Sequence, residues 1–163
     1  MKTDLSIVSI PLRRPRGISL IEVVIVILMI SILSAVALPR WSAAVQFQRV
    51  RHAADRLVTD LSRAREAAYN TSTAKVITFT VGSSQYLISG VKGLDQSSRP
   101  YIISLNDDPY RCTIVSVWGQ RGTQTLTFNG YGLPDRGGTI IVSAGSLQKS
   151  IVIDAGTGTA VVQ

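Results

Sequence analysis

The sequence predicts an α+β protein in which one long N-terminal helix packs on a C-terminal antiparallel β domain. In the first part of the 163-residue chain, a long apolar run is followed by apolar residues at helical spacing. From Lys75 onward they alternate with polar residues, as in strands. The helix is expected to run to about Tyr69, because a polar cluster follows at Asn70–Thr73. The antiparallel β domain is expected over residues 74–163.

The first part of the predicted helix is apolar enough to lie in a membrane. In the run from Ile18 to Leu38 the only charged residue is Glu22, and the run has about the 20 residues that a membrane-spanning helix needs. A carboxylate within lipid costs about 2.5–3.5 kcal/mol on insertion scales, so Glu22 is a candidate functional residue. Residues 18–38 are therefore predicted to form a transmembrane half of the helix.

The segment before this run sets the expected topology. Its basic residues lie on the N-terminal side of the apolar run, and they are Lys2, Arg13, Arg14 and Arg16. Such residues favour a cytoplasmic location for the N-terminal side. The chain is therefore expected to cross a membrane once, with its C-terminal domain on the side away from the cytoplasm. These basic residues also supply part of the net charge of +7, so the rest of the chain is only mildly basic.

The residues around Gly17 resemble the N-terminal signal of type IV pilins and type II secretion pseudopilins. In that family a prepilin peptidase cuts after the glycine, the new N-terminal residue is methylated, and a carboxylate at the fifth mature position guides assembly. The resemblance implies a leader of residues 1–17, cleavage before Ile18, N-methylation of Ile18 and an assembly role for Glu22. The first mature residue is usually Phe in this family, and here it is Ile18.

The resemblance implies an electrostatic role for Glu22. An ion in lipid needs a partner because the hydrocarbon offers no water. The carboxylate would pair with the freed amine of a neighbouring subunit, and bundled helices would cover the apolar run as the subunit leaves the bilayer. The alternative is a carboxylate near the cytoplasmic interface that reaches water and has no partner.

Two other interpretations of the N-terminus remain open. Ala35-Val36-Ala37 fits the cleavage rule of an ordinary secretory signal, but that signal would contain Glu22 in an apolar region longer than usual. The other is a simple membrane anchor that carries a periplasmic β domain and never assembles. A mature chain starting at Leu38 would exclude the pilin interpretation.

Residues 39–70 are predicted to form the amphipathic half of the helix, with a kink near Pro39. The pilin family often carries a proline at the same position. The apolar positions that share one side are Val50, Ala54, Leu57, Leu61, Ala64 and Ala68. The charged residues, Asp60 among them, are expected to lie largely elsewhere, and Arg56 and Asp60 to form a modest surface pair.

Seven or eight short strands are predicted in the β domain. Their expected ranges are 75–81, 85–91, 101–105, 112–118, 124–128, 139–144, 148–153 and 159–162. A polar loop over 93–100 and a glycine-rich loop over 129–138 should separate some of them. Turn residues at Gly82-Ser83-Ser84 and Gly145-Ser146 predict two hairpins.

The residue pattern does not favour catalysis, and no cofactor or metal is expected. Cys112 is the only cysteine, and it is expected to be a small, buried hydrophobic residue. The only histidine, His52, lies far from it in sequence, so the two do not form a metal site or a catalytic dyad. Gly130-Tyr131-Gly132 lacks the Lys-Ser/Thr that grips phosphate.

The C-terminal half resembles the GspH/FimT group of minor pilins. The segments that carry this resemblance are 128–132, 138–142 and 151–156. The resemblance implies a structural subunit of a type II secretion pseudopilus or a type IV pilus, whose partners are prepilin peptidase, other pilins or pseudopilins and the inner membrane.

The alternative within this group is a minor pilin that binds DNA in natural transformation. Some FimT-type members bind DNA through a C-terminal Gly-Arg-x-Arg stretch, whereas the matching residues here are Gly156-Thr157-Gly158-Thr159. The DNA-contact candidates are Arg121, Arg136 and Lys149, which are scattered in sequence and are more typical of a solvated surface.

Overall fold

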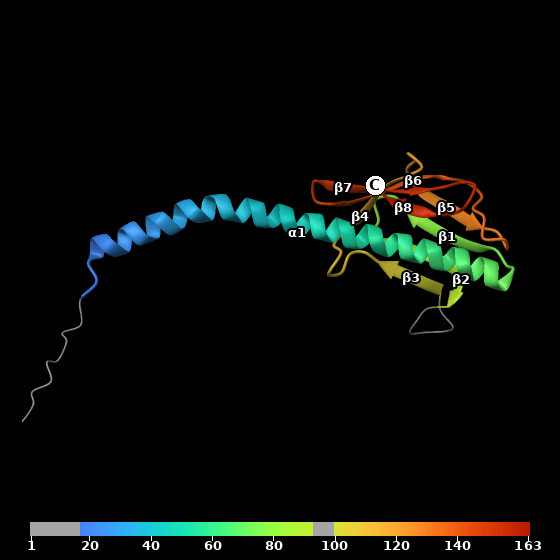
Figure 1. The fold of residues 1–163 in the computed structure, drawn as a ribbon, viewed down its shortest axis with the longest axis horizontal. Coiled ribbons are helices and arrows are strands. Elements are labelled where there is room, and N and C mark those ends of the chain that lie inside the picture. The colour runs from blue at the N-terminus through green and yellow to red at the C-terminus, as the bar shows by residue number, and fades with distance from the viewer. Residues whose placement is uncertain (1–16, 93–99) are drawn as a thin grey trace, which may run out of the picture. The chain divides into compact units, whose positions relative to one another are not determined.

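The computed structural model describes residues 17–92 and 100–163 and confirms the predicted fold class (Figure 1). Residues 1–16 of the predicted leader and most of the predicted 93–100 loop lie outside the described residues. The elements follow in the order α1 (Leu20–Thr71), β1 (Lys75–Thr80), β2 (Gln85–Lys92), β3 (Pro100–Ser104), β4 (Thr113–Val117), β5 (Thr123–Phe128), β6 (Gly138–Ala144), β7 (Leu147–Ile153) and β8 (Ala160–Val162).

The chain divides into two units, Met1–Arg40 and Trp41–Gln163. The described part of the first unit contains the apolar beginning of α1. The second unit contains the rest of α1 and all the described strands. Pro39 lies within the bounds of α1, and the kink predicted there stays a prediction.

The strands form two four-stranded antiparallel sheets, with the orders β3-β2-β1-β5 and β4-β6-β7-β8. The two predicted hairpins are confirmed, since Thr78 lies opposite Leu87 in one and Ile140 opposite Ile151 in the other. Two pairings join strands that are not consecutive: β5 pairs with β1, and β4 pairs with β6. Because β4 joins the second sheet, the chain leaves the first sheet after β3 and returns to it in β5.

Backbone hydrogen bonds join the two sheets at the turn after β1. The Gly82 N–H donates to the Ile114 carbonyl of β4 (2.8 Å), and the Ile114 N–H donates to the Ser83 carbonyl (2.9 Å). Ile114 also lies opposite Val142 in the second sheet. The turn therefore holds the edge of the second sheet against the first.

One hydrophobic core lies between the second part of α1 and both sheets. The buried positions on the helix are Val50, Ala53, Ala54, Leu57, Leu61, Ala64 and Ala68. They include every residue of the predicted apolar side, so that prediction is confirmed. Alanines dominate this stripe, and their small side chains let the helix backbone lie close to the strands.

Asp60 was expected on the solvated side of the helix, and this prediction was wrong. Asp60 is only 2% exposed, because it lies three residues after Leu57 and four before Ala64, on the buried stripe. The predicted pair with Arg56 exists, with 3.0 Å between Nε of Arg56 and Oδ2 of Asp60. It belongs to a partly buried polar network rather than to the surface.

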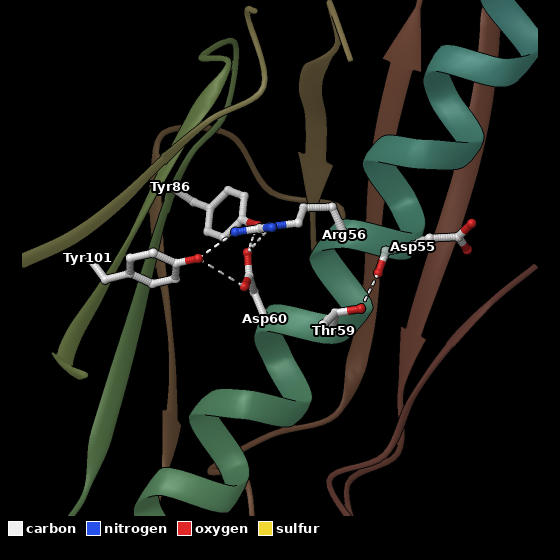
Figure 2. Close-up of polar contacts among 6 residues, drawn as sticks. All are labelled: Asp55, Arg56, Thr59, Asp60, Tyr86 and Tyr101. Atoms are coloured by element: carbon white, nitrogen blue, oxygen red, sulfur yellow. Dashed lines mark hydrogen bonds and ion pairs between the residues drawn. The ribbon is translucent and has the colours of Figure 1, made fainter. Parts of the chain in front are cut away.

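Two tyrosines of the first sheet complete this network (Figure 2). The Tyr86 hydroxyl on β2 donates to Oδ2 of Asp60 (2.6 Å), and the Tyr101 hydroxyl on β3 donates to Oδ1 (3.4 Å). Arg56 also donates a hydrogen bond to Tyr101, and the Arg63 guanidinium lies 4.9 Å from the centre of the Tyr101 ring. Burial and the Asp60 carboxylate raise the pKa of Tyr86, so the phenol remains a donor. The network therefore ties α1 to β2 and β3.

We expect Asp60→Ala to destabilise the fold by about 3 kcal/mol, since it leaves the Arg56 charge and two tyrosine hydroxyls without their acceptor. Denaturant unfolding of the full chain in detergent measures this change. The matched control is Asp55→Ala, because Asp55 is exposed and pairs with Arg51 at 3.9 Å. Its effect should stay within about 0.5 kcal/mol. Equal losses for the two variants would contradict a stabilising role for the network.

Candidate functional site

The side chains of α1 from Leu20 to Leu33 are all exposed. Among the described residues, α1 is the one helix that is long and apolar enough to cross a membrane, with a mean hydropathy of 2.8 over its most apolar window. None of that window is buried among the described residues. An apolar helix without a packing partner is typical of a segment that lies in lipid or packs against other helices.

The residues singled out for processing lie together at the start of this helix. Gly17, Ile18 and Ser19 precede the first helical residue, Leu20. Ile18 is 76% exposed, and, its two chain neighbours aside, no heavy atom of the described residues lies within 4 Å of the position that a Gly17 side chain would take. The bond between Gly17 and Ile18 is therefore accessible in non-helical backbone, as a peptidase requires.

Glu22 lies in the first turn of α1 and is exposed. A carboxylate is favourable there because the N-terminal end of a helix carries a partial positive charge. The Glu22 side chain makes no hydrogen bond or ion pair with any residue that the structure describes. Its acceptor capacity is therefore available to a group from another molecule.

The serines of the apolar segment behave differently from Glu22. The Ser31 hydroxyl donates to the Ile27 carbonyl (2.7 Å), and the Ser34 hydroxyl donates to the Ile30 carbonyl (2.7 Å). Hydroxyls satisfied within their own helix are tolerated in lipid, where water cannot replace a missing partner. Glu22 is charged and has no such bond among the described residues, so it calls for an external partner.

The three candidate DNA contacts come from different elements. Arg121 is exposed in the turn between β4 and β5, Arg136 is exposed in the loop before β6, and Lys149 lies on β7. Nε of Arg136 is 3.3 Å from Oδ2 of Asp135, so a neighbouring acid partly offsets its charge. These residues do not form a single stripe along one element.

The residues that match the Gly-Arg-x-Arg stretch, Gly156–Thr159, form a turn that the acid Asp154 holds in place. Oδ1 of Asp154 accepts hydrogen bonds from the Gly156 N–H (2.9 Å) and the Thr157 N–H (2.7 Å). The Thr157 hydroxyl also donates to it (2.9 Å). The Thr157 side-chain bond and then the backbone bonds of Thr157 and Gly156 lower the pKa of Asp154. The turn therefore presents a negative charge.

Cys112 is buried, as predicted, and lies one residue before β4. Burial raises the pKa of its thiol to about 11, so the nucleophilic thiolate does not form near neutral pH. The thiol donates to the Tyr110 carbonyl (3.1 Å). This arrangement fits a packed side chain.

Sequence reasoning assigned the glycine-rich loop only as a turn. In the structure, Tyr131 of this loop and Tyr69 near the end of α1 are 81% and 65% exposed, and both line a cavity of about 250 Å³. The sequence signal was the run Phe128–Gly132, whose glycines indicate a turn but not what it presents to solvent.

Two family models match the chain. The prokaryotic N-terminal methylation motif matches residues 12–38, and the type II transport protein GspH matches residues 53–158, which is more than half of the chain. No curated protein matches. A solved structure, the type IV minor pilin FimU of Pseudomonas aeruginosa, is similar at 17% identity, with a TM-score of 0.48; the match covers 69% of this chain and 91% of that one.

A methylation motif on a long apolar helix, joined to antiparallel sheets, defines a pilin-like subunit. The two family matches follow the division of the chain into two units. The methylation motif falls within Met1–Arg40, and the second match falls within Trp41–Gln163. The chain belongs to the family of the type II transport protein GspH. This confirms the resemblance that the sequence suggested.

Proposed function

We propose that the chain is a structural minor pilin or pseudopilin, which prepilin peptidase cleaves between Gly17 and Ile18. Cleavage frees the Ile18 amine, which is then methylated, and the subunit leaves the inner membrane to join a type II secretion pseudopilus or a type IV pilus. Before assembly it crosses that membrane once, with its β domain in the periplasm.

The observation that supports this proposal most strongly is the unpartnered Glu22 at the start of an exposed apolar helix. A charge in lipid is unfavourable unless another charge meets it. The freed amine of a neighbouring subunit supplies that charge at the level of the helix N-terminus. Pairing therefore favours subunits whose helices lie side by side, which is the arrangement that also covers the apolar surface.

The DNA-binding alternative has less support. Phosphate recognition needs several cationic contacts along one track. The candidate residues Arg121, Arg136 and Lys149 come from three elements. The Gly156–Thr159 turn has threonines at the two arginine positions and is held by the acid Asp154. We therefore do not assign DNA capture to this chain.

The mature N-terminus tests the proposal directly. In cells with active prepilin peptidase, intact-mass measurement of the membrane-purified chain should give a polypeptide that starts at Ile18 and carries one additional methyl group. A chain that still starts at Met1 would exclude processing. A chain that starts at Leu38 would instead identify an ordinary secretory signal.

A further inference from the structure

A surface at the end of α1 has the composition of a binding site. Its cavity is lined by Arg65, Glu66, Tyr69, Asn70, Tyr131 and Gly132. The first four come from the last turns of α1, and the other two come from the loop between β5 and β6. We call this set the distal surface.

The loop that carries Tyr131 is held rigidly by its own hydrogen bonds. Oδ1 of Asn129 accepts from the backbone N–H groups of Tyr131 (2.9 Å) and Leu133 (3.0 Å). The Asn129 N–H donates to the Leu133 carbonyl (2.9 Å), and the Gly132 N–H donates to the Asn129 carbonyl (2.8 Å). The backbone of this turn is thus fixed before any partner binds.

Glycines let the loop lie directly against the end of α1. A side chain on Gly130 would come within 2.8 Å of the Ser72 carbonyl oxygen. Gly132 has φ +74° and lies against Arg65 and Tyr69. The loop is therefore pressed onto the helix, and Tyr131 is presented from a fixed base.

Exposed aromatic rings on a rigid base favour recognition of another macromolecule. Tyrosine and arginine are enriched at the energetic centres of protein interfaces, and a preorganised loop loses little conformational freedom on binding. Tyr69 and Tyr131 are far more exposed than packing within the domain would require. Neither Arg65 nor Glu66 makes an ion pair with any residue that the structure describes, so both are available to a partner.

The position and charge of the distal surface favour a protein as the partner. Tyr69 lies about 40 Å along α1 from Trp41, the first residue of the folded unit, since a helix rises about 1.5 Å per residue. Arg65 and Glu66 offset each other in charge, which disfavours a polyanion such as DNA. A protein segment can offer an apolar side chain to the tyrosine rings and polar groups to the two charged residues.

We propose that the distal surface binds a neighbouring pilin-class subunit within the filament. This proposal rests on the function proposed above. The neighbour inserts an apolar or aromatic side chain between the rings of Tyr69 and Tyr131, and its flanking polar groups bind Arg65 and Glu66. The contact adds to the helix bundle a second interface, made by the folded unit.

Photocrosslinking of the full chain in cells that contain the complete assembly machinery tests this contact. A photoreactive p-benzoylphenylalanine replaces Tyr131 in one strain and Thr125 in a control strain. Thr125 is also exposed, but it lies on β5, opposite Thr78 in the first sheet. The adducts are identified by mass spectrometry. We expect label at position 131 to give at least about ten times as much crosslinked product as label at position 125. The crosslinked partner should be a second subunit that carries an N-terminal methylation motif.

Substitution of the tyrosine gives an independent measurement. We expect Tyr131→Ser to lower the amount of the chain in the filament fraction about tenfold while its thermal unfolding midpoint is unchanged. Thr125→Ala is the matched control and should leave both quantities unchanged.

The outcomes separate this proposal from the one on which it rests. If the chain is processed and enters the filament, yet position 131 gives no pilin-class adduct, the distal contact is wrong and the proposed function stands. An adduct with nucleic acid, or equal crosslinking from position 125, also overturns the contact. If the chain is neither processed nor incorporated, both proposals fail.

Discussion

Replacing Gly17 by valine should leave the chain at its precursor length in cells that contain active prepilin peptidase. The peptidase of the pilin family cuts after glycine, and a branched side chain at that position would obstruct the bond to be cut. Apart from the two chain neighbours, no described heavy atom lies within 4 Å of the position that the new side chain would take, so the substitution should not disturb the described structure. We expect the processed fraction to fall at least about tenfold, equal to 1.4 kcal/mol or more of lost transition-state stabilisation. Intact-mass measurement of the membrane fraction gives this ratio.

The control for this experiment changes the other side of the same bond. Ile18→Phe introduces the residue that pilins usually carry at the first mature position, and it should be processed like the parent chain. Efficient cleavage of Gly17→Val at the same bond would show that the glycine is not what the enzyme recognises. The assignment of residues 1–17 as a leader would then lose its main support.

Replacing Glu22 by valine should have the second large effect, at a later step. The variant should still be cleaved before Ile18, because the substituted residue lies beyond the bond that is cut. It should fail to enter a filament, because the neighbour's amine would be left in a low-dielectric bundle without its carboxylate. Breaking such a pair costs about 3–5 kcal/mol, which lowers incorporation by about two to four orders of magnitude. The ratio of sheared-filament protein to membrane protein measures this loss.

A matched control is available on the same apolar segment. Ser31→Val also replaces an exposed polar residue by valine, but the Ser31 hydroxyl bonds within its own helix and carries no charge. Its incorporation should therefore match that of the parent chain. Normal assembly of Glu22→Val, with cleavage intact, would count decisively against the electrostatic role of this carboxylate.

The sequence alone was sufficient for the elements of this fold, because local patterns specify them. The alternation from Lys75 and the turn residues at Gly145-Ser146 predicted strands that the structure contains. The pairing of β5 with β1 could not be read in the same way. This pairing depends on which strand edge of the first sheet is free after β4 has joined the second sheet. That edge is set by the assembled core and not by a local sequence pattern.

The error at Asp60 has a specific physical cause. Position 60 lies on the buried stripe, between Leu57 and Ala64, but Asp60 was grouped with the charged residues expected on the other side of the helix. The partners that make its burial possible, Tyr86 and Tyr101, lie on strands far along the sequence. A buried tyrosine hydroxyl needs an acceptor, so inward-facing tyrosines on strands are a signal that a helix acid opposite them is buried.

The candidate sites also differed in how far the sequence could predict them. Gly17, Ile18 and Glu22 could be singled out from the sequence, because their residue types and spacing within a short segment carry the signal. The distal surface joins Tyr69 to Tyr131, which only the docking of the glycine-rich loop on α1 brings to one cavity. Sequence reasoning could predict the turn but not its neighbour.

The buried stripe of α1, from Val50 to Ala68, also decides how the folded unit withstands mechanical load. A force that pulls on the N-terminal end of the helix is carried by side chains along its whole flank, which contact a core shared by both sheets. A strand pulled from the edge of a sheet separates one hydrogen bond at a time, whereas a helix held along its flank must shear many contacts together. Tension applied through α1 is therefore spread over the domain instead of unravelling its strands.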